Sequence, residues 1–179
     1  MRAASVKPAT QAARSSKPDH VVEIVLNPGD FHFGGADTRI RTILGSCVSI
    51  TMWHPIRLIG GMCHYMLPSR NVKRFGKLDG RYADEAMLMF FQGAVHFDTD
   101  PGDYIVKLFG GGNMFPHHLK KQGCADIAHK NAEAALVLTE RYGFKITAQN
   151  MGGTGHRQVV FDIWSGDVWV RQVDVQHSC

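Results

Sequence analysis

Cys47 and His64 are the two side chains of this sequence best suited to covalent chemistry. A β-branched, apolar run over residues 41–51 is interrupted by Gly45-Ser46 directly before the cysteine. This pattern predicts a strand, a tight turn that carries a thiol, and a second strand. His64 ends a later apolar run, which Pro68 stops. A thiol and an imidazole form the core of a cysteine–histidine hydrolase, because a neighbouring imidazolium raises the thiolate fraction.

Each of these residues also has a purely structural explanation. A free cysteine is most often a small buried hydrophobe, and His64 could simply be a hydrogen-bonded residue at a strand end. Cys63 is a competing nucleophile. Because adjacent strand positions point to opposite faces, Cys63 would face the core if His64 faces a site, which favours Cys47.

Three further groups are candidates for supporting roles. Thr42 and Ser46 could orient the imidazole or donate to an oxyanion, although each hydroxyl could equally bond within its own turn. The Gly45-Ser46 turn could present backbone N–H groups to an oxyanion. Gly110, Gly111 and Gly112 are not followed by Lys-Ser/Thr, so a tight loop lining a cleft is preferred to a phosphate-binding loop.

Composition narrows the class of protein. The chain has 179 residues, 44% hydrophobic and 20% charged, which fits one soluble domain. Its net charge of +4 is scattered rather than concentrated in a stripe, so nucleic-acid binding is disfavoured and an acidic protein partner is compatible. The four cysteines contain no C-x-x-C pair, which argues against a zinc ribbon or a disulfide scaffold.

No metal or organic cofactor is expected. His117 and His118, with His64 or His96, could form a metal site, but adjacent histidines after Pro116 are more typical of an exposed loop. The sequence contains no apolar stretch of the roughly 18 residues that span a membrane and no apolar segment in residues 1–20 typical of a secretory signal. We therefore expect a cytoplasmic protein with free thiols.

The elements predicted around these residues indicate a single-domain α/β protein. Residues 1–20 are predicted to be a disordered tail, residues 21–179 the folded domain, and residues 69–79 a basic polar loop. Two helices are predicted, at 82–96 and 124–141. Many strands against two helices favour a layered α/β/β sandwich, two sheets with the helices packed outside. The predicted strands cover residues 21–26, 39–44, 47–53, 58–66, 104–109, 144–151, 157–163 and 167–173.

Five segments, in order along the chain, resemble the CheD family of chemoreceptor glutamine deamidases. The resemblance extends over nearly the whole domain, residues 24–173, although Lys130-Asn131 stands where the family has Arg-Asn, and Cys63 where Asn is more usual. The segments are Leu44-Gly45-Ser46-Cys47-Val48, Gly60-Gly61-Met62-Cys63-His64-Tyr65-Met66-Leu67-Pro68, Arg81-Tyr82-Ala83-Asp84 with Ala86-Met87, Lys107-Leu108-Phe109-Gly110-Gly111-Gly112-Asn113-Met114, and Gly152-Gly153-Thr154-Gly155-His156-Arg157.

The resemblance implies a sandwich similar to the catalytic domain of deamidating toxins. It implies that Cys47 is the nucleophile, that His64 is the general base and acid, and that a threonine before the cysteine is the third residue. Thr42 is the nearest match, and one alternative alignment would place Arg41 there. The implied reaction is hydrolysis of glutamine side chains on the cytoplasmic helical region of methyl-accepting chemotaxis receptors, through a thioester and without a cofactor.

Alternatives from other classes remain open. The resemblance also implies that some family members bind a CheC-type phosphatase, so the chain could act chiefly as an adaptor that binds this phosphatase or a receptor. A generic cysteine hydrolase, such as a peptidase or a transglutaminase-like enzyme, is a second alternative. Intact Cys47 and His64 favour catalysis, since an adaptor needs no reactive thiol. Contact with the membrane is expected only through the receptor.

Overall fold

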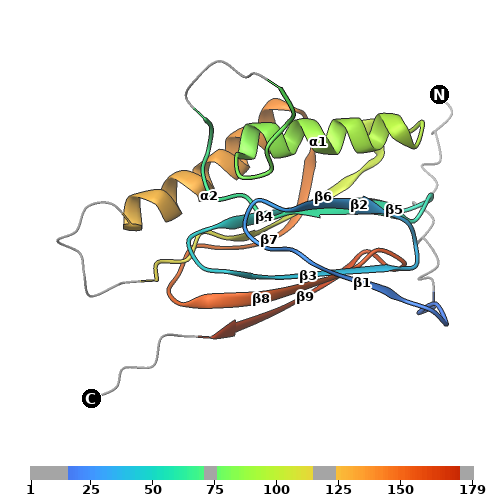
Figure 1. Cartoon of the computed structure of the whole chain (residues 1–179), viewed down its shortest axis with the longest axis horizontal. Helices are drawn as coiled ribbons and strands as arrows, with labels where there is room; N and C mark the ends of the chain where they lie inside the picture. The colour runs from blue at the N-terminus through green and yellow to red at the C-terminus, as the bar shows by residue number, and fades with distance from the viewer. Residues whose placement is uncertain (1–15, 71–75, 115–123, 174–179) are drawn as a thin grey trace, which may run out of the picture.

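The computed structural model describes residues 16–70, 76–114 and 124–173, and these residues form three layers, as Figure 1 shows. Two β-sheets lie face to face, and two helices cover the outer face of one of them. The predicted layered α/β/β sandwich is confirmed. None of the helices in these ranges is long and apolar enough to cross a membrane.

The first sheet has four strands in the order β1-β3-β8-β9. β1 runs parallel to β3, and the other neighbours are antiparallel. Along β3 every second residue is buried, which places Ile40, Thr42 and Leu44 on the face toward the other sheet. The strands are β1 (Val22–Val25), β3 (Thr38–Leu44), β8 (His156–Asp162) and β9 (Asp167–Val173).

The second sheet has five strands in the order β2-β5-β4-β6-β7. Its strands pair antiparallel except for β6 and β7, which run parallel. β4 and β5 are buried along almost their whole length because this sheet is covered on both faces. The strands are β2 (Phe31–Gly34), β5 (Ile59–Cys63), β4 (Val48–His54), β6 (Ile105–Gly110) and β7 (Lys145–Met151).

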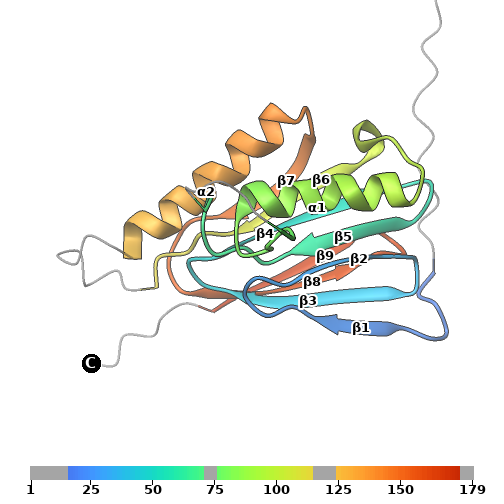
Figure 2. The same cartoon turned by 45° about the horizontal axis from the view of Figure 1, so that its top comes forward.

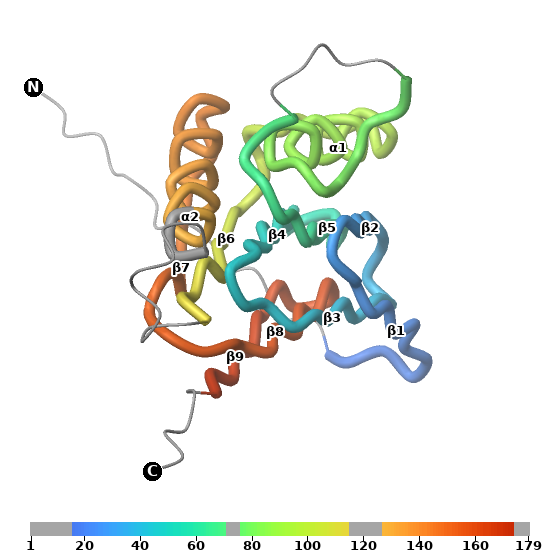
Figure 3. Tube along the Cα trace, turned by 60° about the vertical axis from the view of Figure 1, so that its left-hand side comes forward, coloured from blue at the N-terminus to red at the C-terminus, as the bar shows by residue number. Residues whose placement is uncertain are grey.

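Helices α1 (Ala83–His96) and α2 (Cys124–Arg141) pack side by side over the five-stranded sheet, as Figures 2 and 3 show. A short 3-10 helix, η1 (Pro101–Asp103), leads into β6. The molecule therefore has two apolar cores. One lies between the helices and the five-stranded sheet, and the other lies between the two sheets.

Both predicted helices are confirmed to within one residue, and β2 is the strand that the sequence did not predict. β2 has only four residues, lies at the edge of its sheet, and is flanked by turn residues on both sides. Such a segment is too short to display a period. Residues 16–20 form no helix or strand, while residues 1–15 of the predicted tail and 71–75 of the predicted loop lie outside the described residues.

Phe90→Ala is expected to lower the free energy of unfolding by about 3–5 kcal/mol, because it leaves a cavity in the core beneath α1. Phe90 is fully buried and contacts Phe31 edge-on, with ring centroids 4.9 Å apart. Val95→Ala, on the exposed side of the same helix, should change it by less than about 0.5 kcal/mol. Chemical denaturation measures both, and equal losses would contradict the packing of α1.

Candidate active site

The pairing of β4 with β5 places Cys47 and His64 on the same face of the five-stranded sheet. Thr51 pairs with Met62, and the same register continues to Val48 and Tyr65, which exchange two backbone hydrogen bonds of 3.1 and 2.9 Å. His64 therefore lies opposite Ser49, and Cys47 opposite Met66. Because side chains alternate along a strand, Cys47 and His64 are diagonal neighbours, a relation that brings Cα atoms roughly 7–8 Å apart.

This shared face is the one that points toward the other sheet. Cys47 and Met62 pack against the core between the sheets, whereas Cys63 and Tyr65 belong to the core beneath the helices. The predicted orientation is confirmed: Cys63 faces away from His64. Cys63 is fully buried, and burial raises its pKa to about 12. At neutral pH the Cys63 thiol is therefore protonated and shielded from solvent.

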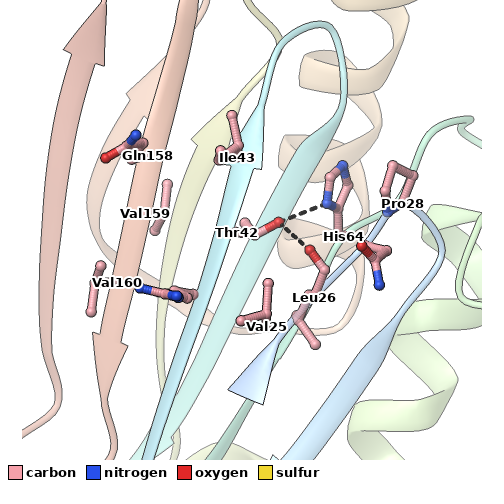
Figure 4. Close-up of a pocket in the computed structure, with 11 residues that line it drawn as sticks. Val25, Leu26, Pro28, Thr42, Ile43, His64, Gln158, Val159 and Val160 are labelled. Carbon is pink, nitrogen blue, oxygen red and sulfur yellow. Dashed lines mark hydrogen bonds between the residues drawn. The ribbon is translucent and has the colours of Figure 1, made fainter. Parts of the chain in front are cut away.

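Thr42, on β3 of the opposite sheet, contacts His64 directly. Its Oγ1 lies 2.8 Å from Nδ1 of His64 and 2.8 Å from the carbonyl oxygen of Leu26 (Figure 4). The carbonyl can only accept a hydrogen bond, so the single hydroxyl proton of Thr42 goes to Leu26. Thr42 then accepts a hydrogen bond from Nδ1–H, and Nε2 of His64 carries the free lone pair of a neutral imidazole.

The surroundings of His64 favour its neutral form. Burial lowers the pKa of His64, and the nearby Leu26 carbonyl and the Asp30 carboxylate oppose this shift in part. The turn that follows β1 holds the histidine backbone: His64 N–H donates to the Asp30 carbonyl at 3.0 Å, and Gly29 N–H donates to the His64 carbonyl at 2.7 Å. A neutral ring with a free Nε2 is the form that can accept a proton.

Cys47 is half-buried and directly precedes β4. Burial raises its pKa, and a side-chain hydrogen bond with Ser46 opposes that shift. Since the His64 pKa is lowered at the same time, the resting pair consists of a neutral thiol and a neutral imidazole. Proton transfer between them would generate the thiolate when it is needed.

The glycine run Gly110-Gly111-Gly112, which begins at the last residue of β6, packs its backbone against the Cys47 turn. Gly112 N–H donates to the Gly45 carbonyl and Gly111 N–H donates to the Cys47 carbonyl, both at 2.8 Å. A Cβ atom added at Gly110, where φ is +117°, would lie 2.2 Å from the Cys47 carbonyl oxygen. Only glycine permits this approach, because a side chain would displace the turn.

A cavity of about 450 Å³ lies beside Thr42 and His64, and residues of β1, β3 and β8 line it. Figure 4 shows Thr42 near the middle of the lining residues, with His64 to its right and Val159 to its left. Cys47 and the three glycines are not among its lining residues. It is lined by Val25, Leu26, Asn27, Pro28, Arg41, Thr42, Ile43, His64, Gln158, Val159 and Val160.

Within the described ranges, no group of three or more His, Cys, Asp or Glu side chains is close enough together to hold a metal ion. His117 and His118 lie outside the described residues. Arg41, the alternative to Thr42, points outward from β3 and pairs with Glu23 at 3.2 Å.

The sequence did not predict the backbone groups that contact Thr42 and His64. The Leu26 carbonyl, which fixes the direction of the Thr42 hydroxyl, has no signature in a residue type. Asp30 carries a weak signal, because the residues before it, Asn27-Pro28-Gly29, are of types typical of a turn. The contact of this turn with His64 depends on β2, which the sequence does not predict.

Similarity to known proteins provides independent evidence about the family of this chain. The model of a family described as CheD chemotactic sensory transduction matches residues 66–172, which begins just after His64. Curated relatives extend the similarity over most of the chain. A probable chemoreceptor glutamine deamidase CheD of Pseudomonas savastanoi pv. phaseolicola is 54% identical over 154 residues, which are 86% of each protein.

More distant relatives are similar over comparable lengths. A probable chemoreceptor glutamine deamidase CheD 3 of Dechloromonas aromatica is 47% identical over 87% of this chain and 91% of its own length. A probable chemoreceptor glutamine deamidase CheD 1 of Leptospira interrogans is 38% identical over 87% of this chain and 96% of its own length.

The rate of Cys47 alkylation by iodoacetamide should rise through the neutral range without a plateau, with a midpoint above the ordinary thiol pKa of 9.0. The reason is that burial disfavours the thiolate, so that it forms only at higher pH. Peptide mass spectrometry would follow Cys47 separately from the other cysteines. Ser46→Ala should move the midpoint higher, since it removes a bond that lowers the pKa. A plateau at neutral pH, typical of a thiolate–imidazolium pair, would contradict this prediction.

Proposed function

The chain belongs to the CheD family of chemotactic sensory transduction, and we propose that it hydrolyses glutamine side chains of methyl-accepting chemotaxis receptors to glutamate. In enzyme terms the proposal is a protein-glutamine glutaminase. The observation that carries it is the Thr42–His64 hydrogen bond, which leaves Nε2 of His64 free on the face that Cys47 shares. The names of the curated relatives, probable chemoreceptor glutamine deamidases, support the proposed substrate and reaction.

The proposed reaction begins with transfer of the Cys47 thiol proton to Nε2 of His64. The sulfur then bonds to the carbonyl carbon of the glutamine amide, and the carbonyl π electrons move to the oxygen. His64 returns its proton to the amide nitrogen, and the C–N bond breaks. Ammonia departs, and the glutamine acyl group remains bound to Cys47 as a thioester. His64 next takes a proton from water, and the hydroxide attacks the thioester. Cleavage of the C–S bond releases the glutamate side chain and a thiolate, which takes the proton back from His64.

The remaining site residues assist these proposed reaction steps, and no cofactor takes part. Thr42 holds the imidazole in the tautomer that accepts a proton on Nε2. The backbone N–H groups of the Gly45-Ser46-Cys47 turn are the proposed donors to the oxyanion. Neither step needs a metal, because the thiol supplies the nucleophile and the imidazole moves the proton.

The proposed substrate segment is the cytoplasmic helical region of the receptor, which places the activity in the cytoplasm. Deamidation turns a neutral side chain into a carboxylate, and local charge on a receptor helix can bias a signalling equilibrium. A CheC-type phosphatase is a further proposed partner. The alternative from another class is an adaptor that binds a receptor or this phosphatase without chemistry.

Wild-type protein incubated with a receptor cytoplasmic fragment should release ammonia and give the mass increase that accompanies replacement of an amide NH2 by OH. Mass spectrometry would identify the modified glutamines. Cys47→Ala should abolish the conversion, whereas Cys63→Ala should keep it, because Cys63 faces the opposite core. Stable binding of the fragment with no mass change would overturn the enzyme proposal and favour the adaptor.

Thr42→Val should lower kcat for deamidation by about 10- to 100-fold with little change in KM, since it keeps the shape but releases the imidazole from its working orientation. Thr42→Ser retains the hydroxyl and should stay close to wild type. Steady-state kinetics on the same fragment separates the two. Equal kcat values for the valine and serine variants would show that the hydroxyl has no part in the reaction.

A further inference from the structure

Each carbonyl of the Cys47 turn is held by its own donor. Gly112 N–H holds the Gly45 carbonyl and Gly111 N–H holds the Cys47 carbonyl, as described above. The carbonyl between them, that of Ser46, accepts a hydrogen bond of 3.1 Å from the side-chain amide of Asn131 on α2. Asn131 is thus the one side chain among these three donors.

Asn131 also holds the strand that carries His64. Its Nδ2 donates a second hydrogen bond, of 2.7 Å, to the carbonyl of Met66, the residue opposite Cys47 in the β4–β5 register. Its main-chain carbonyl accepts from the Tyr65 hydroxyl at 2.7 Å. A single residue therefore connects the segment just before Cys47 with the segment just after His64.

The side-chain amide of Asn131 has a defined orientation. The residue is fully buried, and both acceptors are carbonyl oxygens, so a flipped amide would place Oδ1 against two other oxygens. Oδ1 has no partner among the residues that the structure describes. Burying a polar atom without a partner costs free energy. The two hydrogen bonds of Nδ2 are therefore the interactions that favour an asparagine side chain at residue 131.

The bond to Ser46 determines where the next N–H points. A trans peptide is planar, with its C=O and N–H on opposite sides, and the described chain has no cis peptide. Since the Ser46 carbonyl points toward α2, the Cys47 N–H points away from α2, toward the side on which the four-stranded sheet lies (Figure 3). In the described part of the chain no group accepts a hydrogen bond from this N–H.

We propose that Asn131 is a positioning residue for the oxyanion site: by fixing the Ser46–Cys47 peptide, it aims the Cys47 N–H at the oxygen that becomes negative when the thiolate attacks. This inference rests on the proposed thioester mechanism. It assigns to α2 a part in transition-state stabilisation, although Asn131 itself touches neither the thiol nor the substrate. Hydrogen-bond donors of this kind act only if they are oriented before the reaction starts.

The test compares two reactions of Cys47. Acylation by p-nitrophenyl acetate passes through a tetrahedral oxyanion, whereas alkylation by iodoacetamide displaces iodide at a saturated carbon and forms none. Asn131→Leu keeps the branched shape and removes the donor. It should lower the acylation rate and the kcat for receptor deamidation by about 100-fold or more, while alkylation keeps its wild-type rate and pH dependence.

A matched control separates positioning from a general loss of helix stability. Thr139, on the same helix, is fully buried and donates its hydroxyl to the carbonyls of Ala135 and Leu136. Thr139→Val removes these bonds far along α2 from the turn and should leave acylation, deamidation and alkylation unchanged. Asn131→Ala provides the same comparison if circular dichroism shows that the leucine variant does not fold.

The outcomes distinguish the two proposals. Acylation and alkylation that fall together, or an acylation rate that does not fall, would overturn the role of Asn131 whether or not the wild type deamidates receptors. A wild type that is acylated on Cys47 but modifies no receptor glutamine would overturn the proposed function. In that case the dependence of the acylation rate on Asn131 would still test whether Asn131 positions the Cys47 N–H.

Discussion

The two-residue alternation of β4 and β5, kept in register beyond the ends of the strands, is the constraint on which the candidate site depends. The pair of hydrogen bonds between Val48 and Tyr65 carries the register past the last regular strand residue. A slip by one position would turn Cys63 toward the other sheet and His64 toward the helices. The core beneath the helices opposes such a slip, because it would place the imidazole of His64 among apolar side chains.

The second requirement is that the two sheets pack at a fixed separation. Thr42 belongs to the four-stranded sheet and His64 follows β5 of the other, so their 2.8 Å contact exists only while the sheets stay packed. The apolar layer between the sheets, which includes Leu44, Met62 and Phe109, maintains that separation. Core packing and the protonation state of the imidazole are therefore linked, since the orientation of His64 is a property of the assembled sandwich.

Side chains with a clear pattern were predictable from the sequence, and backbone contacts were not. The helical period of residues 82–96 locates α1, and strand alternation separates His64 from Cys63. Neither pattern reveals that the Leu26 carbonyl directs the Thr42 hydroxyl, or that glycine N–H groups hold the Cys47 turn. These contacts join segments far apart in the chain through groups that every residue carries. Asn131 falls between the two cases, because its type is visible in the sequence but its acceptors are not.

The neutral resting state of Cys47 also bears on oxidative damage. Peroxides react with thiolates far more readily than with thiols, and the products beyond sulfenic acid are irreversible. Because burial raises the Cys47 pKa, only a small fraction of the protein carries a Cys47 thiolate at neutral pH. Cys63 is protected twice, by complete burial and by its own high pKa. In the proposed mechanism Cys47 ionises only as its proton passes to His64, so between reactions it would remain in the thiol form that resists peroxide.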